Sequence, residues 1–218
     1  EYIIKDNSLN FLSSEKDFRG VVNFKPFYLT SDLNFNYISQ KKIFQSESLL
    51  VDLLDSELLN NPNLNASIKI NINQIDKFEH LKNFVSKINL GDGRITMKDF
   101  KTLWNESVFI RSNEIEFLND IDGKKLIGEV IFNFEDIEKF FRYFQIKRNY
   151  RDVFDKIRLD FVYDLTLDKL TMNNLKIDNK SFEKIDEFIN QYNKSKSNLL
   201  NKVTIRNFIK EFFQVYAG

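Results

Sequence analysis

Several segments of this chain alternate apolar and polar residues with a period of two. In residues 27–37 the apolar positions are Phe27, Leu29, Leu33, Phe35 and Tyr37. The same alternation runs through residues 65–73 and 157–165. Successive side chains of a β-strand point to opposite faces of its sheet, so the pattern predicts strands with one apolar and one polar face.

Turn-forming residues divide these strands. Lys25 and Pro26 separate a short predicted strand, residues 18–24, from the longer strand that follows, and a proline there predicts a break or an edge position. Residues 91–93 and 122–123 combine glycine with aspartate, which is typical of tight hairpin turns. Further strands are expected at residues 125–134 and 170–177.

Asn173 and Asn174 interrupt the alternation in the last of these strands, between Met172 and Leu175. The apolar phase shifts by one position across this pair. A shift of this kind predicts a β-bulge, in which one extra residue on a strand bends the sheet.

Four segments place apolar residues at helical spacing. They are residues 41–59, the segment containing Ile137 and Phe144, the segment containing Phe182 and Tyr192, and a closing helix from about Val203. Carboxylates at positions 135–136 would lie at the positive end of the second helix. Residues 193–198 have the composition of a linker.

Together these elements predict an α+β fold. We expect a twisted, mainly antiparallel sheet with an apolar face, flanked by short amphipathic helices and a C-terminal helical segment. The predicted organisation is a β-rich domain over residues 1–194 and an amphipathic helix over residues 195–218 that packs on the same domain.

Composition excludes several function classes. The 32 basic and 32 acidic side chains cancel, so the chain lacks the basic footprint of a nucleic-acid-binding protein. It has no cysteine, which excludes disulfides, thiolate metal sites and cysteine catalysis. No apolar run approaches the roughly 20 residues that span a bilayer, so we expect any membrane anchor to lie upstream of this sequence.

No residue pattern in the chain indicates catalysis, and we expect neither enzymatic activity nor a bound cofactor or metal. His80 is the single histidine and is interpreted as a residue flanking a strand. Residues 119–123 resemble a calcium loop but lack its distal glutamate, so a hairpin turn is favoured. Trp104 is interpreted as a packing anchor.

A local excess of basic residues lies between positions 142 and 158, interleaved with aromatic rings. Such a segment can bind anionic head groups, or it can be an ordinary solvated surface. The head-group candidates are Lys147, Arg148 and Arg151.

The apolar sheet face allows two interpretations. If helices cover it completely, the alternation reports an ordinary core. If part of it is open, a strand of about 11 residues spans roughly 35 Å and can line a groove for an acyl chain. The groove candidates are Leu29, Leu33, Phe35, Ile68, Ile70, Ile72, Val130, Phe132, Leu159 and Phe161.

Four stretches resemble the C-terminal region of the AsmA-like family of bacterial envelope proteins. They read RGVVNFKPFYL from Arg19, LLVDLLDSELLNNPNLNASIKININQI from Leu49, NLGDGRITM from Asn89, and IRLDFVYDLTLDKLTMNNLKID from Ile157. The resemblance lies in pattern rather than in an invariant signature, and the family offers no catalytic motif to transfer.

The resemblance implies a periplasmic protein, anchored in the inner membrane by a segment absent from this sequence. It also implies a role in outer-membrane biogenesis and in phospholipid transport through an apolar β-groove. The expected partners are therefore a phospholipid or another acyl-chain lipid, and envelope proteins, but not nucleic acid. The alternatives are a structural or adaptor module whose sheet is fully covered by helices and, ranked last, an enzyme acting on envelope polysaccharide.

Overall fold

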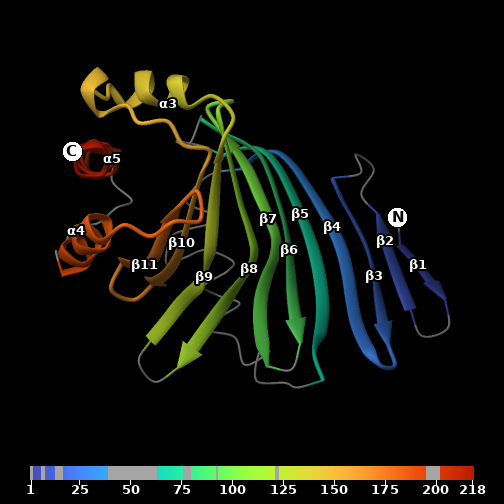
Figure 1. Ribbon diagram of the computed structural model, residues 1–218. Coiled ribbons are helices and arrows are strands. Elements are labelled where there is room, and N and C mark those ends of the chain that lie inside the picture. Colours follow the sequence, from blue (N-terminus) through green and yellow to red (C-terminus); the bar gives the residue numbers. More distant parts are fainter. Residues whose placement is uncertain are drawn as a thin grey trace. The chain divides into compact units, whose positions relative to one another are not determined.

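The computed structural model describes residues 2–5, 8–12, 17–38, 63–75, 80–91, 93–120, 123–194 and 202–218 (Figure 1). The strands within these residues are β1 (Tyr2–Lys5), β2 (Ser8–Leu12), β3 (Phe18–Phe24), β4 (Phe27–Ile38), β5 (Asn65–Ile75), β6 (Leu81–Gly91), β7 (Arg94–Trp104), β8 (Val108–Asp120), β9 (Gly123–Phe134), β10 (Lys156–Asp164) and β11 (Lys169–Ile177). The helical elements are α3 (Ile137–Phe144), the 3-10 turn η2 (Arg148–Tyr150), α4 (Glu183–Lys194) and α5 (Lys202–Ala217).

The described part of the chain is mostly β with some helices, which agrees with the expected α+β class. The strand order follows the sequence from β1 to β11. The sheet is mixed, because β5 runs parallel to β4. The pairs β1–β2, β2–β3, β3–β4, β5–β6, β6–β7, β9–β10 and β10–β11 are antiparallel.

The parallel pair was not predicted. Two parallel neighbours require a crossover connection of about a dozen residues or more, and residues 39–64 are long enough to supply one. The helix predicted at residues 41–59 lies outside the described residues.

Contacts divide the chain into two compact units. The first unit comprises Glu1–Asn105 and Asn113–Phe117, and the second comprises Glu106–Ser112 and Leu118–Gly218. In the second unit α5 packs into the core, where Phe213 lies 5.1 Å from Phe141 and 5.7 Å from Phe154 between ring centroids.

Several turns fall where the sequence predicts them. Lys25 and Pro26 form the turn between β3 and β4, and Gly91 pairs with Arg94 across the β6–β7 hairpin. The predicted bulge in β11 is present, because the register with β10 shifts between Arg158 and Asp160, and Asn174 has a φ of 50°. The short strands β1 and β2 were not predicted.

The helices of the second unit gather around aromatic side chains. Asp136 caps α3, since its Oδ1 accepts a hydrogen bond of 2.8 Å from the backbone N–H of Lys139, which fulfils the expectation for this position. Phe141 of α3 and Phe213 of α5 are buried against one another. Among the described helices, none is long and apolar enough to span a bilayer.

Candidate functional site

Strand register places six groove candidates on one face of the first unit. Paired residues of neighbouring strands share a face, and Leu33 is opposite Ile70 while Phe35 is opposite Ile72. Leu29 is opposite Ala66, and Ile68 is opposite Ser31. On the other side of β4, strand β3 continues the same face. We call this surface the β3–β5 apolar face, and its apolar residues are Phe18, Val22, Phe24, Phe27, Leu29, Leu33, Phe35, Ala66, Ile68, Ile70 and Ile72.

Exposure varies systematically along this face. On β5, Ile72 is only 3% exposed and Ala66 is also buried. Leu29, Leu33, Phe35, Ile68 and Ile70 are half-buried. On β3 and at the start of β4 the exposed fractions rise to 43% for Phe18, 50% for Phe24 and 37% for Phe27. The face is therefore closed on part of β5 and open at Phe18 and Phe24 of β3 and at the start of β4, while Val22 is half-buried.

Hydroxyl groups on the β3–β5 apolar face and its continuation on β6 are satisfied by the sheet itself. Ser31 Oγ donates to the carbonyl of Arg19 at 3.0 Å, and Ser86 Oγ, opposite Ile70, donates to the carbonyl of Lys98 at 3.2 Å. Both serines are buried. A buried hydroxyl that is already hydrogen-bonded leaves the surface around it apolar.

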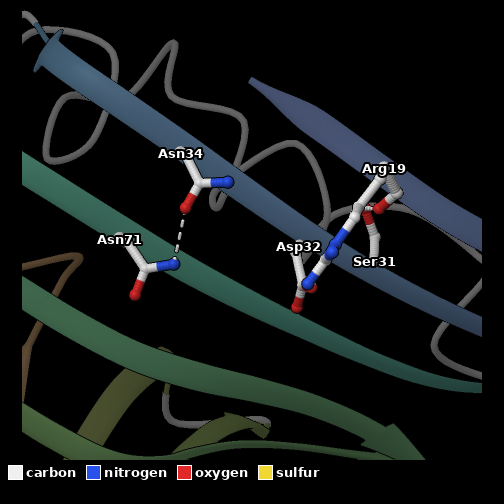
Figure 2. A network of polar contacts seen from close by, with 5 residues as sticks. All are labelled: Arg19, Ser31, Asp32, Asn34 and Asn71. Atoms are coloured by element: carbon white, nitrogen blue, oxygen red, sulfur yellow. Dashed lines mark hydrogen bonds and ion pairs between the residues drawn. The ribbon is translucent and has the colours of Figure 1, made fainter. Parts of the chain in front are cut away.

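The opposite face of the same strands carries a ladder of polar side chains. Asn71 Nδ2 donates to Asn34 Oδ1 at 2.8 Å, and Arg19 forms an ion pair with Asp32 at 2.7 Å (Figure 2). Further along, Asn73 donates to Asn36 at 3.0 Å. β3, β4 and β5 thus separate an apolar surface from a hydrated one.

The other four groove candidates lie together in the second unit. Val130 is opposite Leu159, and Phe161 is opposite Met172. Phe132, opposite Ile157, is half-buried like Val130 and Phe161, whereas Leu159 is buried.

A helix packs against this part of the sheet. The side chain of Asn193 in α4 accepts from the N–H of Met172 at 2.9 Å and donates to its carbonyl at 2.7 Å. Ile185 and Ile189 of α4 are buried. Leu159 and Met172 therefore belong to the core of the second unit rather than to an open face.

The three head-group candidates have different surroundings. Lys147 and Arg148 are exposed around η2. Arg151 is half-buried: its Nε donates to the carbonyl of Ile146 at 2.9 Å, its Nη1 lies 3.3 Å from Glu138, and its guanidinium lies 5.8 Å from the centroid of the Phe141 ring. These contacts assign Arg151 to the packing of α3 against the segment that follows it.

His80, Trp104 and Tyr163 occupy structural positions. His80 precedes β6 and its ring lies 6.3 Å from that of Trp104, in agreement with the interpretation of both residues. Burial and then a hydrogen bond to Asp168 raise the pKa of Tyr163 well above its ordinary value, so this phenol stays neutral. Within the described ranges, no group of three or more histidine or acidic residues is placed to hold a metal ion.

Sequence reasoning missed the exposed aromatic residues at the β3–β4 turn. Phe24 and Phe27 are directly opposite one another, and Tyr28 follows on the other face. The available signal was the aromatic residues on both sides of Lys25 and Pro26.

A comparison with known protein families, curated proteins and solved structures finds no match to this chain.

Proposed function

We propose that this chain is a non-catalytic lipid-binding segment that holds acyl chains on the β3–β5 apolar face. The observation that carries the proposal is the exposure of Phe18, Phe24 and Phe27 on a face whose opposite side carries the polar pairs Arg19–Asp32, Asn34–Asn71 and Asn36–Asn73. Large apolar side chains that share one exposed surface mark a site of interaction.

The physical driving force is the removal of apolar surface from water. Each Å² covered contributes about 25 cal/mol, and an acyl chain lying along the strands would cover aromatic and aliphatic groups together. The 12 residues of β4 extend over about 40 Å, so one strand offers a long track. Binding and release along such a track require no covalent step.

The setting we propose follows from the resemblance to the AsmA-like family. The chain would act in the bacterial periplasm, in phospholipid transport and outer-membrane biogenesis, with an inner-membrane anchor supplied by a segment outside this sequence. Phospholipid or another acyl-chain lipid is the proposed ligand. Lys147 and Arg148 are the exposed cations that we propose as head-group contacts in the second unit.

Native mass spectrometry of the purified chain, followed by solvent extraction, tests this proposal. We expect a phospholipid or fatty acid at a defined stoichiometry. Leu33→Glu places a carboxylate on the β3–β5 apolar face and should reduce the lipid-bound fraction at least about tenfold, because an apolar ligand cannot solvate the charge. Thr30→Glu, on the exposed opposite face, is the matched control and should retain lipid.

Circular dichroism and the midpoint of urea unfolding establish whether each variant is folded. A folded Leu33→Glu protein that retains lipid like the unchanged chain contradicts the proposal. So does an unchanged chain that is lipid-free after purification and takes up no lipid from added micelles.

A second candidate function has its own supporting observation. In the second unit α4 packs against β11 with Ile185 and Ile189 buried, which is the arrangement expected of a module whose sheet is covered. A structural or adaptor role that docks an envelope protein would use the surfaces of such helices. A lipid-free and monodisperse chain would favour this role.

A further inference from the structure

The turn between β3 and β4 is an exposed aromatic tip, which we define as Phe24, Lys25, Pro26, Phe27 and Tyr28. All five residues are exposed, with Tyr28 at 39%. In Figure 1 this turn joins the blue strands labelled β3 and β4. Water-exposed rings cost free energy, so three in one short turn indicate a surface that is covered by something else.

The rings of the aromatic tip lie on both faces of the hairpin. Phe24 and Phe27 pair directly and belong to the β3–β5 apolar face, while Tyr28 pairs with Asn23 on the polar face. Packing against one side of the sheet could cover only one of these two sets. A medium that surrounds the end of the hairpin can cover both.

The charge of the aromatic tip is also one-sided. Lys25 is its only ionisable group besides the Tyr28 phenol, and residues 20–31 contain no carboxylate. The nearest one along the chain on the β4 side, Asp32, is paired with Arg19. Aromatic rings together with lysine are the side chains that favour the interface of a bilayer, where the rings reach the acyl boundary and the ammonium meets phosphate.

We infer that the aromatic tip inserts into the interfacial region of a phospholipid bilayer. The inference rests on the proposed function, because the tip is continuous with the surface that would receive lipid. Starting from the turn, the first cross-strand pair on the β3–β5 apolar face is Phe24 with Phe27, and the next apolar pair is Val22 with Leu29. Phe18 lies further along β3 on the same face. An acyl chain leaving the bilayer at the tip would stay in contact with apolar side chains.

Sedimentation of the full chain with vesicles tests the inference. The vesicles contain three parts phosphatidylcholine to one part phosphatidylglycerol. The double variant Phe24→Ser/Phe27→Ser should lower the bound fraction at least about tenfold, because it removes both rings that would leave water. The matched control is Leu167→Ser, which removes a side chain 71% exposed at the β10–β11 turn and should change binding by less than about twofold.

A second pair of variants keeps the test decisive if the double variant does not fold. Tyr28→Ser and Lys25→Glu each alter one exposed residue, and each should weaken vesicle binding by about threefold or more, the latter most strongly at low salt. Vesicle binding that is absent in the unchanged chain, or equal in all folded tip variants, overturns the inference. Self-association that disappears in the tip variants while vesicle binding persists also overturns it, by assigning the tip to a contact between copies.

The two proposals fail in distinguishable ways. If the unchanged chain binds vesicles through the aromatic tip but carries no extractable lipid and takes up none from added micelles, the tip assignment stands and the proposed function fails. If lipid is retained and every folded tip variant binds vesicles normally, the proposed function stands and the tip assignment fails.

Discussion

Single residues show most directly how context changes a role inferred from sequence. Arg151 belongs to a basic segment and was a head-group candidate together with Lys147 and Arg148. Its guanidinium instead bonds a backbone carbonyl and lies over the Phe141 ring. Nothing in the local sequence distinguishes it from Arg148, because the difference arises from α3 folding back over the segment that follows it.

Arg151→Ala is therefore expected to destabilise the fold. A charged donor to a half-buried carbonyl and a cation over a ring together contribute about 1–2 kcal/mol to the free energy of unfolding, while the ion pair with the exposed Glu138 adds little. Arg148→Ala is the control and should stay within about 0.5 kcal/mol. Urea unfolding measures both. If Arg151→Ala leaves the free energy of unfolding unchanged but weakens binding to anionic vesicles, Arg151 contacts head groups and does not stabilise the fold.

Among the elements, the contact between α4 and β11 is held by a residue that sequence reasoning placed in a linker. Asn193 and the residues after it have loop composition, yet α4 extends through Lys194. The amide of Asn193 satisfies both the N–H and the carbonyl of Met172. Because that bonding is tertiary, composition alone could not have located the end of the helix.

Asn193→Ala should cost about 1–3 kcal/mol in the free energy of unfolding, because it leaves two part-buried backbone groups of β11 without their partner. Gln191→Ala, at an exposed position of the same helix, is the matched control and should be nearly neutral. Hydrogen exchange of the Met172 amide gives a local measurement. An exchange rate unchanged by Asn193→Ala would show that the side chain is not protecting this edge.

At the scale of the whole molecule, the strand order follows the sequence, so each strand is stabilised mainly by its neighbours along the chain. Contiguous parts of a protein can open locally with free energies below that of global unfolding. The two units defined by contacts are consistent with this behaviour.

Leu159→Ala in β10 is expected to lower the free energy of unfolding of the second unit by about 2–5 kcal/mol, because it leaves a cavity in that core. Hydrogen exchange followed by mass spectrometry should show faster exchange in β9, β10 and β11 and unchanged exchange in β5 and β6. Ile88→Ala, at a buried position of β6, should give the reverse pattern. Equal acceleration throughout the chain would mean that both units unfold as one.

The sheet itself was largely predictable. Period-two alternation located β4, β5 and β10 because these strands each have one apolar face, and turn residues located the break at Pro26 and the hairpin at Gly91. The strands β1 and β2 were not predicted, because four or five residues are too few to establish a period of alternation. The parallel pairing of β4 with β5 was not predicted either, because alternation shows which side chains share a face but not the direction in which the neighbouring strand runs.

The sequence by itself determined which side chains share a face, since backbone geometry forces alternate residues of a strand to opposite sides. It also excluded cysteine chemistry, through composition. Only the tertiary structure decided which parts of the apolar faces are covered. Leu33 and Leu159 have the same local pattern, yet Leu33 lies half-buried opposite the exposed Phe18 of β3, and Leu159 is buried in the core on which α4 packs. Burial depends on what packs against a strand, and that partner comes from elsewhere in the chain.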